Sequence, residues 1–153
     1  SPCRRVMQHM LDSENLGLVI TRRVELGHFE HVFCTDSLIG HHSMSAKEVN
    51  YICPLWVKSS KVQTELIGSD PYSRSNFRPE FVTELAEAVQ LSRTDELSAE
   101  IPPTALFYYI YAVLHSPTYR SRYSAFLKND YPRIPLPATS ATATAIRRSG
   151  SST

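Results

Sequence analysis

Residues 16–24 read LGLVITRRV, and this stretch decides the fold because β-branched and other apolar side chains dominate it. Such side chains favour the pleated, half-buried surface of a sheet, so we expect a strand here. Gly27 and His28 follow with the composition of a turn, and residues 29–34 (FEHVFC) resume the apolar pattern. The sequence from 16 to 34 therefore predicts a hairpin or the start of a meander.

A third strand is predicted over residues 51–57, which read YICPLWV. Pro54 lies inside this stretch and has no amide hydrogen to donate, so we expect the strand at an edge of the sheet or at a bulge. A polar loop over 36–45 precedes it. At the start of the chain, residues 3–12 place apolar side chains at helical spacing, which predicts a short amphipathic helix. Residues 1–57 thus form a β-rich part.

The second half of the chain, residues 77–137, has the pattern of helices. Apolar side chains recur every three or four residues over 78–91 and again after Pro102. Ser116-Pro117 resembles a helix cap followed by proline in the first turn, which predicts a third helix. Together the two parts predict an α+β domain, a small and mostly antiparallel sheet followed by a cluster of two or three helices.

The domain is expected to cover residues 1–137, with a polar, turn-rich linker or loop over 58–76 between its two parts. Residues 138–153 are small and polar, and we expect them to form a disordered tail. The abrupt change near Pro137 indicates a truncation or a shifted reading frame. Because residue 1 is not methionine, we expect a piece of a longer protein.

Composition narrows the classes of function. Of the 153 residues, 42% are hydrophobic and 20% are charged, which is enough for a packed core. Lys and Arg number 16 against 15 Asp and Glu, which gives a formal net charge of +1. This charge excludes a strongly basic protein that coats nucleic acid, but it does not exclude a local basic face. Three cysteines without a CxxC pair favour a reducing, cytoplasmic setting. The longest apolar run, Ala105 to Leu114, reaches about half of a membrane span.

Signatures of catalysis or metal binding are weak. His28, His31 and Cys34 form an HxxHxxC pattern, but on a strand His31 points away from the other two, so three ligands cannot converge. Cys34 and Cys53 lie in apolar strands, which raise the pKa of a thiol and lower its reactivity. No GxxxxGK[ST] or GxGxxG motif occurs. We therefore expect no catalytic residue, metal or cofactor, and an enzyme that uses His and Cys is a minor alternative.

Basic side chains lie in the first predicted strand, at Arg22 and Arg23, and in or beside Ser-rich loops, at Lys47, Lys58 and Lys61. Arg and Lys with interleaved Ser and aromatic residues commonly hold phosphates and read base edges, although charged residues often only solvate a surface. The polar segments 36–47 and 58–76 are the candidate reading loops. The candidate DNA-binding residues are Arg22, Arg23, His41, His42, Ser43, Ser45, Lys47, Lys58 and Lys61.

Four segments of the chain resemble a known family. They are NLGLVITRRV (15–24), HVFCTDSLIG (31–40), EVNYICPLWV (48–57) and FYYIYAVLHSPTYRSRYSAFLKNDYPRIPLP (107–137). They resemble the C-terminal specificity region of bacterial type ISP restriction–modification enzymes, and the resemblance covers roughly residues 3–137. The last segment also resembles a pattern shared with other target-recognition domains. In that pattern a helix is followed by His-Ser and then by Ile-Pro-x-Pro.

The resemblance implies a role in choosing DNA sequence rather than in breaking bonds. In the family, one long chain carries a nuclease, a helicase-like ATPase, an adenine-N6 methyltransferase and this recognition domain. The family's recognition region extends beyond the PRIP segment (132–135), so we expect a fragment of the domain. The implied partners are double-stranded DNA and the methyltransferase domain of the same polypeptide. The alternative is an interaction module that docks the methyltransferase without touching DNA.

Overall fold

The structure is a computed structural model that describes residues 7–11, 15–25, 27–58, 72–88 and 101–136. It divides into two compact units. The first, called the sheet unit, comprises Ser1–Asn76 and Leu114–Pro132, and the second, called the helix unit, comprises Phe77–Val113 and Arg133–Thr153. Among the described residues, no helix is long and apolar enough to cross a membrane.

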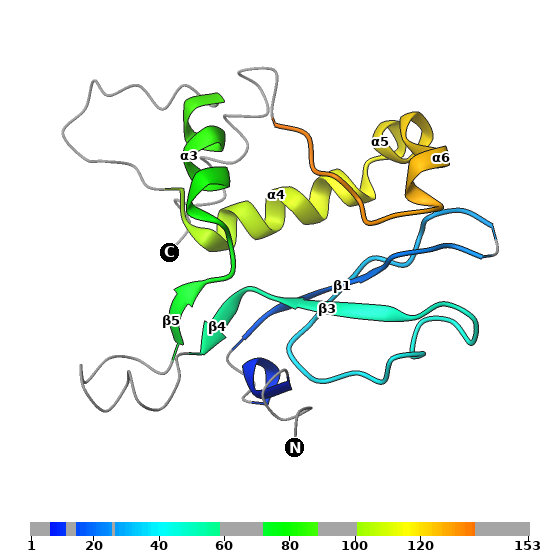
Figure 1. Ribbon diagram of the computed structural model, residues 1–153, viewed down its shortest axis with the longest axis horizontal. Helices are drawn as coiled ribbons and strands as arrows, with labels where there is room; N and C mark the ends of the chain where they lie inside the picture. The colour runs from blue at the N-terminus through cyan, green and yellow to red at the C-terminus, as the bar shows by residue number, and fades with distance from the viewer. Residues whose placement is uncertain (1–6, 12–14, 26, 59–71, 89–100, 137–153) are drawn as a thin grey trace. The chain divides into compact units, whose positions relative to one another are not determined.

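A three-stranded antiparallel sheet forms the centre of the sheet unit (Figure 1). Strand β1 (Gly17–Thr21) lies between β2 (Phe33–Thr35) and β3 (Asn50–Pro54). Every residue of β1 is buried, which explains its continuous run of apolar and β-branched side chains. The predicted strand over 16–24 therefore ends earlier than expected, at Thr21.

Gly17 marks a close approach between β1 and its neighbours. A Cβ atom at this position would lie 2.6 Å from Cγ2 of Ile52 on β3 and 3.0 Å from Cε of Met10. Because the Ile52 methyl belongs to a branched side chain, it cannot swing aside easily. Glycine at position 17 thus allows β1 and β3 to pair while Met10 packs against them.

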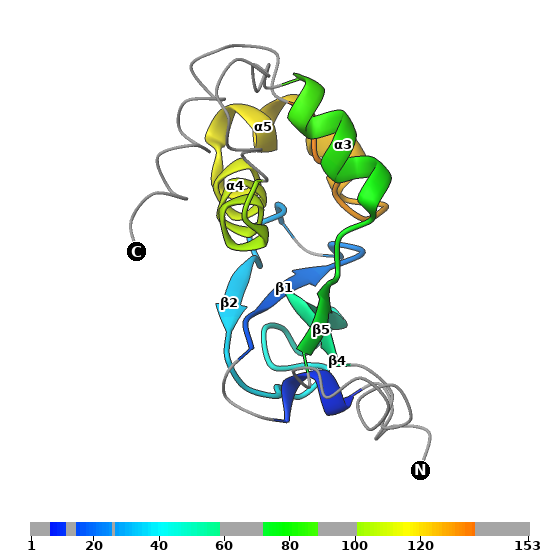
Figure 2. The same cartoon turned by 90° about the vertical axis from the view of Figure 1, so that its left-hand side faces the viewer.

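The predicted strand over 51–57 is two strands that belong to different sheets. Pro54 ends β3, which is an edge strand of its sheet as expected, and β4 (Trp56–Lys58) pairs with β5 (Tyr72–Ser75) beside it in Figure 2. Leu55 lies between them, is 2% exposed, and donates its N–H to the carbonyl of Leu16 at 2.7 Å. The sequence predicts a linker or loop over 58–76 and does not predict the strand β5. Residues 59–71 of that segment lie outside the described residues.

Two short helices complete the sheet unit. Helix α5 (Pro117–Arg122) begins as predicted, because the Ser116 hydroxyl accepts the Tyr119 N–H at 3.3 Å and proline occupies the first turn. The predicted third helix breaks at Tyr123 and continues as α6 (Ser124–Leu127). Near the start of the chain, the described part of the expected helix over 3–12 is a single 3-10 turn, η1 (Gln8–Met10).

The helix unit has a core of its own. Helix α3 (Pro79–Ala88) contributes Leu85, and helix α4 (Pro103–His115) contributes Ala105, Leu106 and Tyr109 to one buried cluster. Figure 1 shows α3 at a steep angle to α4. The Tyr109 hydroxyl donates to the carbonyl of Pro135 at 2.7 Å, which ties the segment after the last helix to this core. An antiparallel sheet and a group of helices confirm the α+β class.

Candidate nucleic-acid interface

A surface cleft of about 320 Å³ lies where β1 ends and β3 begins. Three of the residues predicted to bind DNA, Arg22, Arg23 and Lys47, line it together. The two arginines follow β1 directly, and Lys47 precedes β3, so antiparallel pairing of these strands carries both segments to the same end of the sheet. Its remaining lining residues are Glu25, Glu48, Val49 and Tyr51.

The two arginines differ in their surroundings. Both were expected within the strand predicted over 16–24, but β1 ends at Thr21 and both lie just past it. Arg22 Nε lies 3.7 Å from Asp130 Oδ1, and its guanidinium carbon lies 5.5 Å from the centre of the Tyr131 ring. Arg23 is exposed and has no ion pair with any residue that the structure describes. Of the two arginines, Arg22 therefore has neighbouring side chains that hold its guanidinium, and Arg23 has no ion-paired neighbour among the described residues.

Lys47 is exposed and lines the same cleft. Its backbone N–H donates to the hydroxyl of Ser45 at 3.3 Å, a local bond that shapes the segment before β3. Within the described ranges no carboxylate pairs with its ammonium group. Ser45 thus contributes to the shape of this segment.

A tight turn over residues 40–43 presents both histidines of the predicted reading loop. The side chain of Asn50 holds this turn from inside: its amide nitrogen donates to the Gly40 carbonyl at 3.0 Å, and its oxygen accepts the Ser43 N–H at 3.1 Å. Asn50 is 6% exposed, whereas His41 and His42 are exposed with ring centres 4.4 Å apart. The turn is therefore a fixed platform for exposed polar side chains.

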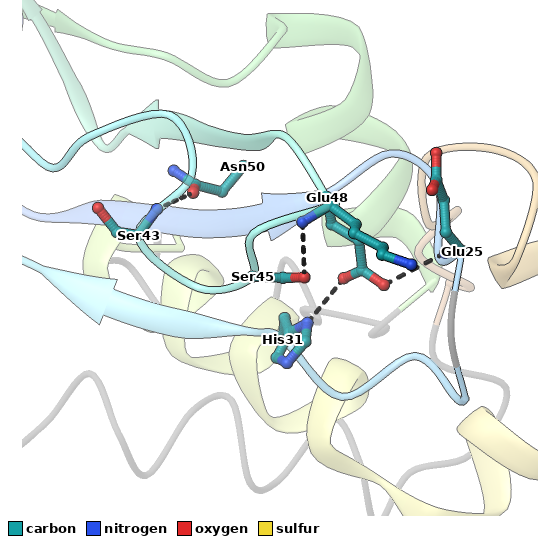
Figure 3. Close-up of polar contacts among 7 residues, drawn as sticks. Glu25, His31, Ser43, Ser45, Glu48 and Asn50 are labelled. Carbon is teal, nitrogen blue, oxygen red and sulfur yellow. Dashed lines mark hydrogen bonds and ion pairs between the residues drawn. The ribbon is translucent and has the colours of Figure 1, made fainter.

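Glu48 connects the segments around the cleft, as Figure 3 shows. It is 3% exposed, and its carboxylate accepts the backbone N–H of Glu25 at 3.2 Å and pairs with His31 Nδ1 at 2.8 Å. A buried carboxylate is costly unless it has such partners. Glu48 thereby joins the chain after Arg23 to the chain before β3.

The other predicted cations lie elsewhere or outside the description. Lys58 ends β4, and its backbone N–H donates to His9 Nδ1 at 3.0 Å, so it lines neither wall of this cleft. Lys61 lies outside the described residues. The DNA-binding residues predicted from the sequence therefore do not all lie at this cleft.

A second cleft, of about 380 Å³, lies between residues 28–30 and the helices α5 and α6. Its walls include Arg120 and Lys128. The Nε group of Arg120 donates to the carbonyl of Leu114 at 2.6 Å, which closes the end of α4. Arg120 is therefore engaged in the fold on this side of the sheet unit.

The structure also shows the surroundings of the histidines and cysteines considered in the sequence. Among the described residues, no group of three or more His, Cys, Asp and Glu side chains could hold a metal ion. Of the HxxHxxC pattern, His31 is paired with Glu48 instead. Partial desolvation raises the pKa of the Cys34 thiol and of the Cys53 thiol, and the charge of Asp36 adds to the effect at Cys34. Both shifts disfavour the reactive thiolate.

Five residues of this region were not found from the sequence. Glu48 and Asn50 brace the loops, and Tyr51, Asp130 and Tyr131 surround Arg22. A lone polar residue beside a strand gives no periodic signal, and Asp130 is far from Arg22 in the sequence. The resemblance of residues 107–137 to the family was the one signal in the sequence that pointed to the segment containing Asp130 and Tyr131.

The comparison with family models defines the class of this protein as a specificity domain, the part of a restriction–modification enzyme that recognises the target. The model of the type ISP C-terminal specificity domain matches residues 1–152. The chain belongs to this family. A search of curated proteins gave no match, and a search of solved structures gave none.

Proposed function

We propose that this domain selects the target of its parent enzyme by direct contact with double-stranded DNA at the sheet-end cleft. The observation that carries the proposal is the convergence of Arg22, Arg23 and Lys47 on one cleft beside the braced 40–43 turn. Sequence reading by proteins relies on a few side chains held on a rigid scaffold, with cations on the flanking phosphates.

In this proposal the roles divide by surroundings. Arg23 and Lys47 are exposed and lack an ion partner among the described residues, so they are free to neutralise phosphates. His41 and His42 stand on the turn as adaptable polar groups that reach base edges or sugar–phosphate oxygens, whereas the Ser43 hydroxyl donates to the Gly40 carbonyl at 2.8 Å and helps to close the turn. The nuclease, ATPase and adenine-N6 methyltransferase steps belong to other domains of the parent polypeptide.

The test measures binding of the parent polypeptide to target and scrambled duplexes over a series of salt concentrations. We expect Arg23→Ala and Lys47→Ala each to weaken binding to both duplexes and to lower the slope of log K against log salt by about one. Arg78→Ala is the matched control, because Arg78 is also exposed but does not line the cleft.

The rival proposal is a module that docks the methyltransferase domain without touching DNA. It predicts that Arg23→Ala and Lys47→Ala bind both duplexes like the unaltered enzyme, with the same salt slope. That result would contradict DNA contact at this cleft. A cleft variant that lost affinity for the separated methyltransferase domain, and not for DNA, would favour the rival directly.

A further inference from the structure

We propose that Arg22 recognises a guanine in the major groove and that Asp130 and Tyr131 hold its side chain for that contact. The inference rests on the proposed function and adds to it the residue that reads a base and the base that it reads. It distinguishes Arg22 from Arg23, which is its neighbour in sequence and in the cleft.

Two partners hold the Arg22 side chain. Asp130 Oδ1 lies 3.7 Å from Nε, and the Tyr131 ring lies under the guanidinium at 5.5 Å. The carboxylate is itself held, because the backbone N–H of Tyr131 donates to the same Oδ1 at 2.9 Å. An arginine held in this way gives up less side-chain freedom when it binds a ligand.

The segment that carries the brace is attached to the segment that carries the arginine. The N–H of Val24 donates to the carbonyl of Lys128 at 3.1 Å, and the ring of Tyr131 meets that of Tyr51 on β3 edge to face, 5.4 Å between centres. The segment that carries Asp130 and Tyr131 is therefore attached both to the chain after Arg22 and to β3. These contacts set where the Arg22 guanidinium lies relative to β1 and β3.

The donors that remain on Arg22 match guanine. A guanidinium carries five N–H donors in a planar fork, and Asp130 faces only the Nε side. No other polar partner of Arg22 occurs within the described residues, and its side chain is 52% exposed on the cleft. The O6 and N7 atoms of guanine are two adjacent acceptors that accept both terminal nitrogens together.

The carboxylate of Asp130 also distinguishes a base from a phosphate. A phosphate bound to Arg22 would bring a second negative charge close to Asp130, and like charges at that range repel. The edge of guanine is neutral and meets no such penalty. Arg23 has no ion-paired carboxylate among the described residues, so it suits a phosphate better.

The experiment exposes the full parent polypeptide to a pool of random-sequence duplexes and sequences those that bind. Arg22→Gln and Arg23→Gln form a matched pair, because each removes one positive charge from the same cleft. We expect Arg22→Gln to reduce the preference for guanine at one position of the selected motif by roughly 5- to 100-fold. Arg23→Gln should weaken binding to all duplexes and leave the motif unchanged.

Asp130→Asn tests the brace with a side chain of the same shape. We expect it to reduce the same guanine preference while total DNA binding becomes tighter, because a negative charge is lost. If binding tightened on all duplexes and the guanine preference stayed, Asp130 would merely compete with phosphate for Arg22, and the inference would be overturned.

Failure of the inference and failure of the proposed function look different. If Arg23→Gln weakened binding but Arg22→Gln left the motif unchanged, DNA contact would stand and guanine reading by Arg22 would fall. If neither variant changed affinity or motif, both would fall together. The Asp130→Asn variant decides the inference even if the loss of Arg22 disturbs the fold.

Discussion

Asn15 is a polar side chain that is buried for structural reasons. It is 1% exposed, and its amide donates to the carbonyls of His9 and Trp56 at 2.7 and 2.8 Å. Its oxygen accepts the Trp56 N–H at 3.1 Å. Asn15 therefore acts as an extra strand residue that joins the start of β1 to β4 and to η1.

Replacing Asn15 by alanine should destabilise the fold by about 3 kcal/mol, because three buried backbone groups lose their partner at once. Urea unfolding measures the change. Asn129→Ala is the control: the Asn129 amide donates to the Ala125 carbonyl at 3.0 Å on an exposed surface, so its loss should cost well under about 1 kcal/mol. Equal losses for the two variants would contradict this account of Asn15.

His9 makes the stability depend on pH. Burial lowers the pKa of His9 first, and the charge of Lys58 lowers it further. The neutral ring also accepts the Lys58 N–H at Nδ1. Because the folded pKa lies below the ordinary value of about 6.5, the stability due to His9 is complete above that pH and is lost as the pH falls through the folded pKa.

We therefore expect the difference in unfolding free energy between the unaltered protein and His9→Gln to shrink as the pH falls from 7 to 5. Glutamine offers an acceptor and does not titrate, so its own curve should be flatter there. Urea unfolding at a series of pH values measures both curves. Parallel curves over this range would show that His9 does not carry the dependence.

At the scale of elements, the connections on either side of the cleft depend on Glu48. Glu48→Ala should cost about 1–3 kcal/mol, because the Glu25 N–H and His31 lose a buried partner. Amide hydrogen exchange should quicken at Glu25 and in the segment before β3. Glu84→Ala, at an exposed position of α3, is the control. Exchange as slow as in that control would contradict the bracing role.

The sequence predicted the strands better than their partners. Pro54 indicated an edge strand, because a missing amide hydrogen is a local property of the residue, and β3 does lie at an edge. The separation of β3 from β4 at Leu55 depends on bonds to Leu16 and Asn76, which no local pattern contains. β5 was missed for another reason: its residues YSRS are mostly polar and carry no strand pattern of their own, so only the pairing with β4 makes the segment a strand.

The candidate site was also predicted only as far as local sequence patterns allow. Arg22, Arg23 and Lys47 were identified from residue type, the arginines on a predicted strand and Lys47 beside a loop, and the pairing of β1 with β3 brings them together. The sequence could not separate the braced Arg22 from the unbraced Arg23, because the difference lies in Asp130 and Tyr131 of a remote segment. The residue types could be recognised from the sequence alone, but the neighbours that distinguish Arg22 from Arg23 could not.

At the scale of the whole molecule, the formal net charge of +1 limits what this domain contributes to DNA affinity. With positive and negative charges so nearly balanced, the proposed function assigns most of the salt-dependent binding to other domains of the parent polypeptide. It assigns to this domain the choice of sequence. The proposed function therefore predicts that specificity moves with the domain.

Exchange of this domain between two members of the family that select different targets tests that prediction most directly. The selected sequence of each hybrid polypeptide is read from the duplexes that it enriches from a random pool. The account predicts that the selected sequence moves with the domain. Hybrids that kept the targets of the polypeptides receiving the domain would contradict it.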